Sequence, residues 1–154
     1  MAPSRVPIPI TQRARKFCEE FTLNFANEAF IQEALRAAGA GGSTAGNKNL
    51  ALIGDSILRT YFQIEGYKRG KSRGEIDDIV KKLACNAHLT KRGFDLGLDA
   101  YIWNNPSQGN VISDGLMATT VEAIIGAAFL ANGQALATTT PVITAFGLTW
   151  PEEE

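Results

Sequence analysis

The segment Asn47–Leu58, near the middle of the 154-residue chain, constrains the fold more than any other part of the sequence. Apolar side chains recur at Leu50, Ile53, Ile57 and Tyr61, at intervals of three or four residues. This spacing places them on one face of an α-helix, with a polar stripe on the opposite face. The segment therefore predicts an amphipathic helix that buries one face against the rest of the protein.

The remaining apolar residues also follow a helical period, and no alternation typical of strands persists. Thr11, Asn27 and Asp114 stand where N-caps are expected, and Ser72 and Glu75 have the spacing of a capping box. These signals predict an all-α fold, with helices over residues 12–21, 28–38, 47–64, 73–83, 87–94, 115–131 and 140–147.

Glycine and proline mark the expected breaks between these helices. Four glycines within Gly39–Gly46 predict a mobile loop, and Asn132-Gly133 predicts the end of the longest apolar helix. Thr140-Pro141 has the order of a cap followed by a proline, which predicts the start of the last helix. The chain length suits one domain. We expect an irregular segment over 1–11, one helical domain over 12–147 and a tail over 148–154.

The composition is that of an ordinary globular protein, with 45% hydrophobic and 20% charged residues. A net charge of −1 argues against a protein that coats nucleic acid by bulk charge. No segment suggests a membrane span, so we expect no membrane partner. The two cysteines, Cys18 and Cys85, lie far apart and favour a reducing, intracellular compartment, the cytoplasm first. The basic stretch before Glu19 leaves a mitochondrial location open, although its prolines argue against a targeting helix.

One region departs from the even distribution of charge. Cations outnumber acids between Lys68 and Arg92, and four of them, Lys68, Arg69, Lys71 and Arg73, lie within six residues. Arginine and lysine contacts to phosphates give RNA affinity that is independent of sequence and sensitive to salt. The alternative is that these are ordinary solvated charges of helices and loops.

Two stretches of the sequence together resemble ribonuclease III endonuclease domains. The residues Leu50–Leu58, Leu-Ala-Leu-Ile-Gly-Asp-Ser-Ile-Leu, resemble the signature helix of that family, which is normally written Leu-Glu-Phe-Leu-Gly-Asp-Ser-(Val/Ile)-Leu. Met117–Ala127 resembles its second acidic helix, usually Ala-Asp-x-(Val/Leu)-Glu-Ala-(Leu/Ile)-Ile-Gly-Ala. The two motifs stand in the family's order, and the resemblance covers residues 12–147. It implies a ribonuclease III-like helical domain, without a separate double-stranded-RNA-binding domain after it.

The resemblance also implies where the chemistry of the family is carried. Members cleave RNA with the help of Mg²⁺, which four carboxylates hold, two on each helix. At those positions this chain has Ala51 and Asp55 on the first helix and Thr119 and Glu122 on the second. A further supporting acid of the family falls at Arg73. The catalytic and metal-binding candidates are therefore Asp55 and Glu122, the remnants of a site expected to bind Mg²⁺ weakly or not at all.

Three functions remain open on this sequence. The first is an inactive or weakly active ribonuclease III-like homodimer that binds structured or double-stranded RNA, or an RNA-processing or ribosomal partner. The second is an active, metal-dependent double-stranded-RNA endoribonuclease with an altered site. The third is an interaction protein unrelated to RNA that uses the same fold. Whether the protein is an enzyme is thus undecided at this stage.

Overall fold

The computed structural model describes residues 8–152, and the expected irregular segment 1–11 therefore falls largely outside them. Apart from one isolated bridge between Arg36 and Trp103, these residues hold no β-structure, which confirms the all-α fold. The helices are α1 (Ile10–Phe21), α2 (Glu28–Ala34), α3 (Lys48–Lys68), α4 (Arg73–Leu83), α5 (Asn86–Asp95), α6 (Asp114–Ala131) and α7 (Leu136–Ala145), with 3₁₀ turns η1 (Ala40–Gly42), η2 (Leu98–Tyr101) and η3 (Pro106–Gln108).

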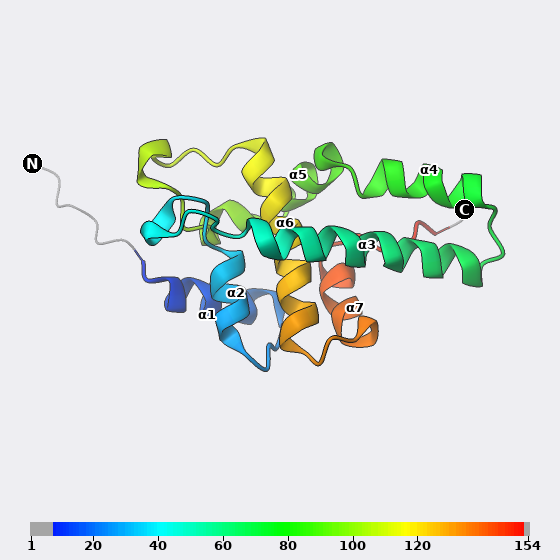
Figure 1. Ribbon diagram of the computed structural model, residues 1–154, viewed down its shortest axis with the longest axis horizontal. Helices are drawn as coiled ribbons and strands as arrows, with labels where there is room; N and C mark the ends of the chain where they lie inside the picture. The colour runs from blue at the N-terminus through cyan, green and yellow to red at the C-terminus, as the bar shows by residue number, and fades with distance from the viewer. Residues whose placement is uncertain (1–7, 153–154) are drawn as a thin grey trace, which may run out of the picture.

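Helix α6 forms the centre of the molecule, and α3 crosses it while α2, α5 and α7 pack around it (Figure 1). Its buried residues cover every side of the helix, as expected where neighbours surround it. By length and composition α6 is the one described helix that qualifies as a membrane span, contrary to our expectation that no segment would. Most of it lies inside the fold, as in the core helix of a globular domain.

Two glycines allow α3 and α6 to cross in close contact. A Cβ atom at Gly54 would overlap the carbonyl oxygen of Glu122, and one at Gly126 would overlap the carbonyl oxygen of Leu50. Each helix therefore places a bare backbone against the backbone of the other. This contact fixes the positions of Asp55 and Glu122, because each is within four residues of a contact glycine.

Helix α4 runs back beside α3, so that the two helices form a projecting hairpin (Figure 1). The predicted capping box is confirmed: the amide of Glu75 donates to the Ser72 hydroxyl at 3.1 Å, and the amide of Ser72 donates to the Glu75 carboxylate at 3.1 Å. The amphipathic pattern of α4 is also confirmed, since Val80 is buried and Ile76, Ile79 and Leu83 pack against the core.

Several predicted helix ends were wrong. Helix α1 begins at Ile10 with Pro9 as its N-cap, so Thr11 lies inside the helix. Helix α2 ends at Ala34 rather than Ala38, and Ser113 rather than Asp114 caps α6, accepting from the amide of Leu116. A 3₁₀ turn at Ala40–Gly42 interrupts the predicted loop, and its Ala40 is buried.

The start of α7 was also predicted wrongly. The helix begins at Leu136, and Pro141 lies within it although proline cannot donate to the helical ladder. Threonine hydroxyls bond the carbonyls of the preceding turn: Thr139 donates to Ala135 at 2.9 Å, and Thr140 donates to Leu136 at 3.1 Å. These bonds add to the first turn of the helix before the proline is reached.

The segment after α7 is part of the packed structure up to Trp150, although we expected a tail. Leu148 and Trp150 are both buried, and the Trp150 amide donates to the hydroxyl of Tyr61 on α3 at 3.2 Å. The Trp150 ring lies beside Gly66 and under the guanidinium of Arg69, 5.7 Å from the ring centroid. The segment therefore ties the end of the chain to the α3–α4 hairpin.

We predict that Gly54→Ala destabilises the protein by roughly 1–3 kcal/mol, because the added methyl group forces α3 and α6 apart. Gly74→Ala is the matched control, since a Cβ there meets open space on an ordinary helical backbone. It should leave stability unchanged or raise it by up to about 1 kcal/mol. Urea unfolding followed by circular dichroism measures both. Equal stability of the two variants would contradict the role assigned to the crossing.

Candidate functional site

The α3–α6 crossing brings together the two acids that the sequence identified. Asp55 lies on α3 and Glu122 lies on α6, and their carboxyl groups are close enough for a hydrogen bond between them to contribute to the raised pKa of Glu122. Such a bond requires a proton on one of the two groups, because a carboxylate can only accept. The side chain of Asp55 is 38% exposed, so the pair is open to solvent on one side.

Glu122 keeps its proton up to about neutral pH. Burial, followed by the charge of Asp55 and the hydrogen bond to it, raises the pKa of Glu122 to about 7. The nearby Arg59 guanidinium opposes the rise but does not cancel it. Below about pH 7 the metal-free pair therefore carries one negative charge rather than two.

Arg59 is a site residue that the sequence analysis missed. Its Nε donates to Oδ1 of Asp55 at 3.1 Å from one turn further along α3. The i, i+4 spacing of an acid and a cation on a predicted helix could have indicated this pair. The contact places a fixed positive charge on the remaining exposed carboxylate of the site.

The two positions at which the family carries acids offer no charged ligand here. Ala51 is 8% exposed and belongs to the core between α3 and α6. Thr119 is half-buried, and its hydroxyl has no hydrogen-bond partner among residues 8–152. Within the same residues no group of three or more acid, histidine or cysteine side chains could hold a metal ion.

These side chains fit a catalytic Mg²⁺ centre poorly. Magnesium requires several oxygen ligands in near-octahedral geometry and usually retains some of its waters. Here only two carboxyl groups meet, one of them shares a proton, and Arg59 occupies the other. Two other acids on these helices are placed elsewhere: Glu75 closes the capping box of α4, and Asp114 lies in the first turn of α6, about two turns before Glu122.

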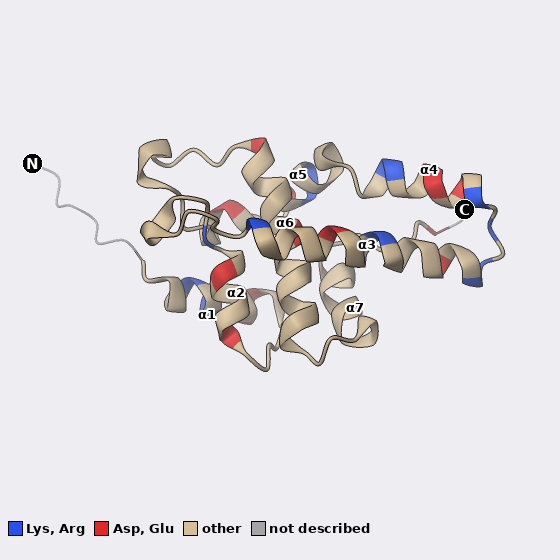
Figure 2. Cartoon of the chain, viewed as in Figure 1, with Lys and Arg blue, Asp and Glu red and all other residues tan. Residues whose placement is uncertain are grey.

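The four cations proposed to bind RNA gather at the far end of the α3–α4 hairpin, which we call the basic tip (Figure 2). Lys68 ends α3, Arg73 begins α4, and Arg69 and Lys71 lie in the connection. Glu65 partly neutralises the basic tip, at 3.9 Å from Lys68 and 3.5 Å from Arg69.

The basic tip and the carboxyl pair are separate sites on one helix. Thirteen residues of α3 separate Asp55 from Lys68, which corresponds to about 20 Å. Arg73, where the resemblance placed a supporting acid, lies at the basic tip and not beside Asp55. The structure thus brings Asp55 next to Glu122, and it gathers the four cations in a separate region at the end of the α3–α4 hairpin.

Comparison with known proteins supports this reading of the two helices. The family model of the Ribonuclease III domain matches residues 48–133, which include both acids. The chain is 26% identical over 123 residues to Ribonuclease 3 of Shewanella sediminis, covering 77% of this chain and 54% of that protein. It is 32% identical over 111 residues to Ribonuclease 3 of Psychromonas ingrahamii, covering 69% and 48%. The chain thus spans about half the length of the curated relatives it matches.

The fold is similar to that of solved nuclease domains. The nuclease domain of ribonuclease III from Campylobacter jejuni superposes with a TM-score of 0.75 at 20% identity, over 91% of this chain and 97% of that chain. A second structure of that domain, described for flexibility in a region involved in dimer formation, also has a TM-score of 0.75, at 21% identity over 89% of this chain and 98% of that chain.

The shared proton predicts how stability depends on pH in the metal-free protein. Between the ordinary glutamate pKa of 4.5 and about 7, Glu122 binds more protons in the folded state than in the unfolded state, so its contribution to stability falls as the pH rises. The lowered pKa of His88 contributes a smaller change in the opposite direction. Solvent screening at the half-buried Glu122 side chain limits its loss to about 1–2 kcal/mol. Glu122→Gln should remove most of the decline and be more stable than the wild type at pH 8.

Urea midpoints measured between pH 4.5 and 8 in the presence of EDTA test this expectation. Asp77→Asn is the control, because Asp77 is exposed on α4 and should leave the pH dependence as it is in the wild type. If Glu122→Gln retained the full wild-type decline, the proton would have to reside elsewhere.

Proposed function

This chain belongs to the ribonuclease III domain family, and we propose that it binds double-stranded or structured RNA while having lost most or all of the cleavage activity of that family. The observation that carries the proposal is the pairing of Arg59 with Asp55 beside the protonated Glu122, at 3.1 Å. The guanidinium bonds one oxygen of Asp55 and the proton occupies one oxygen of the pair, so both compete with a divalent metal for these ligands.

The ligand set supports a weak or absent affinity for Mg²⁺. Each carboxylate that is replaced removes a charged oxygen ligand, and Ala51 and Thr119 are two such replacements. To bind the ion, the pair would have to release its proton and Arg59 would have to leave Asp55. Both steps cost free energy and so lower the apparent affinity for the ion.

The basic tip supports RNA binding that does not depend on the metal. Its cations project from the end of a long hairpin, where the phosphates of a duplex can reach them without contact to the core (Figure 2). Contacts of this kind bind nucleic acid through the phosphate backbone and are independent of sequence. A protein partner in an RNA-processing or ribosomal particle remains a further candidate.

An active endoribonuclease with an altered site is the second candidate function. The specific observation in its favour is that Asp55 and Glu122 still meet across the helix crossing and remain open to solvent. The third reading, an interaction protein unrelated to RNA, has no contact in its favour, and the cations of the basic tip weigh against it.

A homodimer is part of the same proposal. Leu52 on α3 is 72% exposed, an unusual position for a large apolar side chain, and it points away from the core that α3 shares with α6. A related nuclease domain from Campylobacter jejuni has a region involved in dimer formation. Burial of Leu52 against a second copy would remove this apolar surface from water, and sedimentation equilibrium tests it.

The RNA-binding proposal predicts that a 20-base-pair duplex binds equally well in Mg²⁺ and in EDTA, with an affinity that falls as salt rises. The double variant Lys68→Ala/Arg73→Ala should weaken binding and lower the slope of log Kd against log salt by about 2. Lys16→Ala, an exposed cation on α1, is the matched control. Fluorescence anisotropy of a labelled duplex measures the affinity and its salt dependence for the wild type and for both variants.

Two results would count against this proposal. Binding that disappears in EDTA would show that the metal site carries the interaction. An unchanged salt slope in the double variant would show that the basic tip does not contact the phosphates.

The loss of ligands predicts how cleavage could be restored. The triple variant Ala51→Glu/Thr119→Asp/Arg59→Leu should raise Mg²⁺-dependent cleavage of duplex RNA above background. Residues 51 and 119 lie one turn from Asp55 and Glu122, so both new carboxylates enter the cluster. No single change should suffice, because ligands of one metal act as a unit. A gel assay with single variants as controls measures the gain.

A wild-type protein that cleaves as fast as the triple variant would favour the second candidate function. A triple variant that folds and binds Mg²⁺ but does not cleave would place the defect in how RNA docks, rather than in the ligands.

A further inference from the structure

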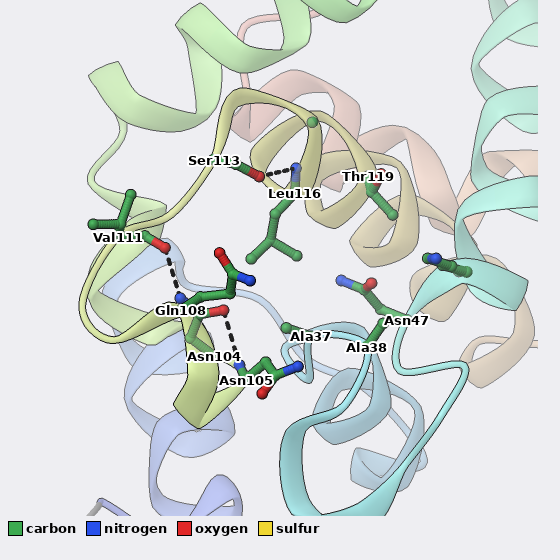
Figure 3. A pocket seen from close by; sticks show the side chains of 12 residues that line it. Ala37, Ala38, Asn47, Asn104, Asn105, Gln108, Val111, Ser113, Leu116 and Thr119 are labelled. Carbon is green, nitrogen blue, oxygen red and sulfur yellow. Dashed lines mark hydrogen bonds between the residues drawn. The ribbon is translucent and has the colours of Figure 1, made fainter.

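A cavity with both polar and apolar walls lies at the amino-terminal ends of α3 and α6, one to two helical turns from the carboxyl pair (Figure 3). Its volume is about 330 Å³, within the range of small-ligand sites. Four segments form its walls: the residues after α2, the start of α3, the loop 104–111 and the first turns of α6. None of its lining residues belongs to the carboxyl pair or to the basic tip.

The loop wall is held in place by hydrogen bonds. The amide of Ala37 donates to the carbonyl of Trp103 at 2.9 Å, and the amide of Trp103 donates to the carbonyl of Leu35 at 2.8 Å. The Asn104 side chain donates to the carbonyl of Val111 at 2.7 Å, which closes the loop on itself. The cavity is therefore preformed rather than a gap between mobile segments.

Asn47 presents an oriented hydrogen-bond acceptor at this cavity. The residue is 1% exposed, and its Nδ2 donates to the carbonyl of Ala34 at 2.9 Å and to the hydroxyl of Thr120 at 3.0 Å. The hydroxyl proton of Thr120 is committed to the carbonyl of Leu116, so this oxygen can only accept from Asn47. These partners fix the amide, and its Oδ1 has no partner among residues 8–152.

Asn47 is one of the residues that line the cavity, although it is almost fully buried. Its Nδ2 is engaged by two acceptors, whereas its Oδ1 has no partner among residues 8–152. A ligand that donates a hydrogen bond would satisfy this oxygen.

The other walls combine neutral polar groups with apolar surface. The Thr119 hydroxyl and the Gln108 amide have no side-chain partners among the described residues, and Ala37 and Leu116 add apolar surface (Figure 3). Lys48 is the one charged residue among the lining side chains described. Mixed donors and acceptors between apolar walls suit a flat heteroaromatic ring. They suit a hydrocarbon poorly, because the Asn47 oxygen would remain unpaired.

The cavity lies on the same two helices as the carboxyl pair, so an RNA strand that passes the pair could also reach the cavity. On α3, Lys48 lies two turns before Asp55, and on α6, Thr119 lies one turn before Glu122. A nucleotide whose base lay in the cavity would therefore have Lys48 near its phosphate and its strand running toward Arg59. A paired base cannot reach the cavity, because its hydrogen-bonding edge is occupied within the duplex.

We propose that this cavity binds the base of an unpaired nucleotide, so that the domain distinguishes RNA with a bulge or a single-stranded end from a fully paired duplex. The inference rests on the proposed function, since RNA binding must bring the strand to the cavity. Asn47 supplies the fixed acceptor, Gln108 and Thr119 supply adaptable polar contacts, and Leu116 contacts the face of the base.

The test compares a 20-base-pair duplex with the same duplex carrying a single-nucleotide bulge. Wild-type protein should bind the bulged RNA roughly tenfold more tightly, the gain expected for one sequestered base. Gly115→Phe should abolish the difference and leave duplex affinity unchanged, because Gly115 lines the cavity and a Cβ there meets open space. Gly115→Ala is the matched control and should retain the difference. Gln108→Ala should reduce it.

A second measurement does not depend on duplex binding. Each of the four nucleoside monophosphates is titrated into the labelled protein, and the side-chain amide of Asn47 and the methyl group of Thr119 are followed by NMR. Shifts at these groups in the wild type that are lost in Gly115→Phe support the cavity, whether the nucleotide is free or part of RNA.

The outcomes separate the two proposals. Duplex binding without preference for the bulge, and without shifts at Asn47, would overturn the cavity proposal while RNA binding stands. Nucleotide shifts at Asn47 without any binding of duplex would overturn the proposed function while the cavity keeps its ligand class. Gly115→Phe and Gly115→Ala losing the preference equally would also overturn the cavity proposal, because only the larger side chain fills the space.

Discussion

The close contact between the backbones of α3 and α6 is the constraint on which the rest of the structure depends. Gly54 and Gly126 each accommodate a carbonyl oxygen of the opposite helix where any side chain would overlap it. The contact sets the distance between the helices to that of two backbones, so residues on either side of it meet directly. The carboxyl pair lies beside this contact, and the cavity lies one to two turns toward the helix starts.

The crossing also explains why the site can change its chemistry without losing its geometry. Helix packing at the glycine contact holds Asp55 next to Glu122. Two carboxylates forced together repel, and the repulsion is relieved here by a shared proton and by the guanidinium of Arg59. Replacing acids by Ala51 and Thr119 lowers that repulsion further. The residues that remain are compatible with a stable fold and with RNA binding, and they fit a metal centre poorly.

The two proposed contact regions lie on opposite sides of the carboxyl pair along α3. The basic tip lies at the carboxyl-terminal end of the helix and the cavity at its amino-terminal end. A 21-residue helix spans about 30 Å, which is comparable to one turn of an RNA duplex and its flanking nucleotides. One rigid helix would thus present phosphate contacts at one end and a base contact at the other, with the carboxyl pair between them.

The sequence by itself determined the all-α class, the two long amphipathic or apolar helices and the capping box of α4, because these follow from local periodicity and spacing. Asp55 and Glu122 were singled out only by the resemblance of the two helices to the family motifs. The sequence did not determine the start of α7, since the threonine bonds that precede Pro141 are not coded by proline position alone. Arg59 could have been found from its i, i+4 spacing to Asp55, which the resemblance had already singled out. Only the tertiary structure decided that the pKa of Glu122 is raised, that Trp150 packs on α3, and that the side-chain oxygen of Asn47 lacks a hydrogen-bond partner among residues 8–152. Each of these depends on residues more than sixty positions apart, and burial and hydrogen-bond geometry between such residues arise only when the helices pack.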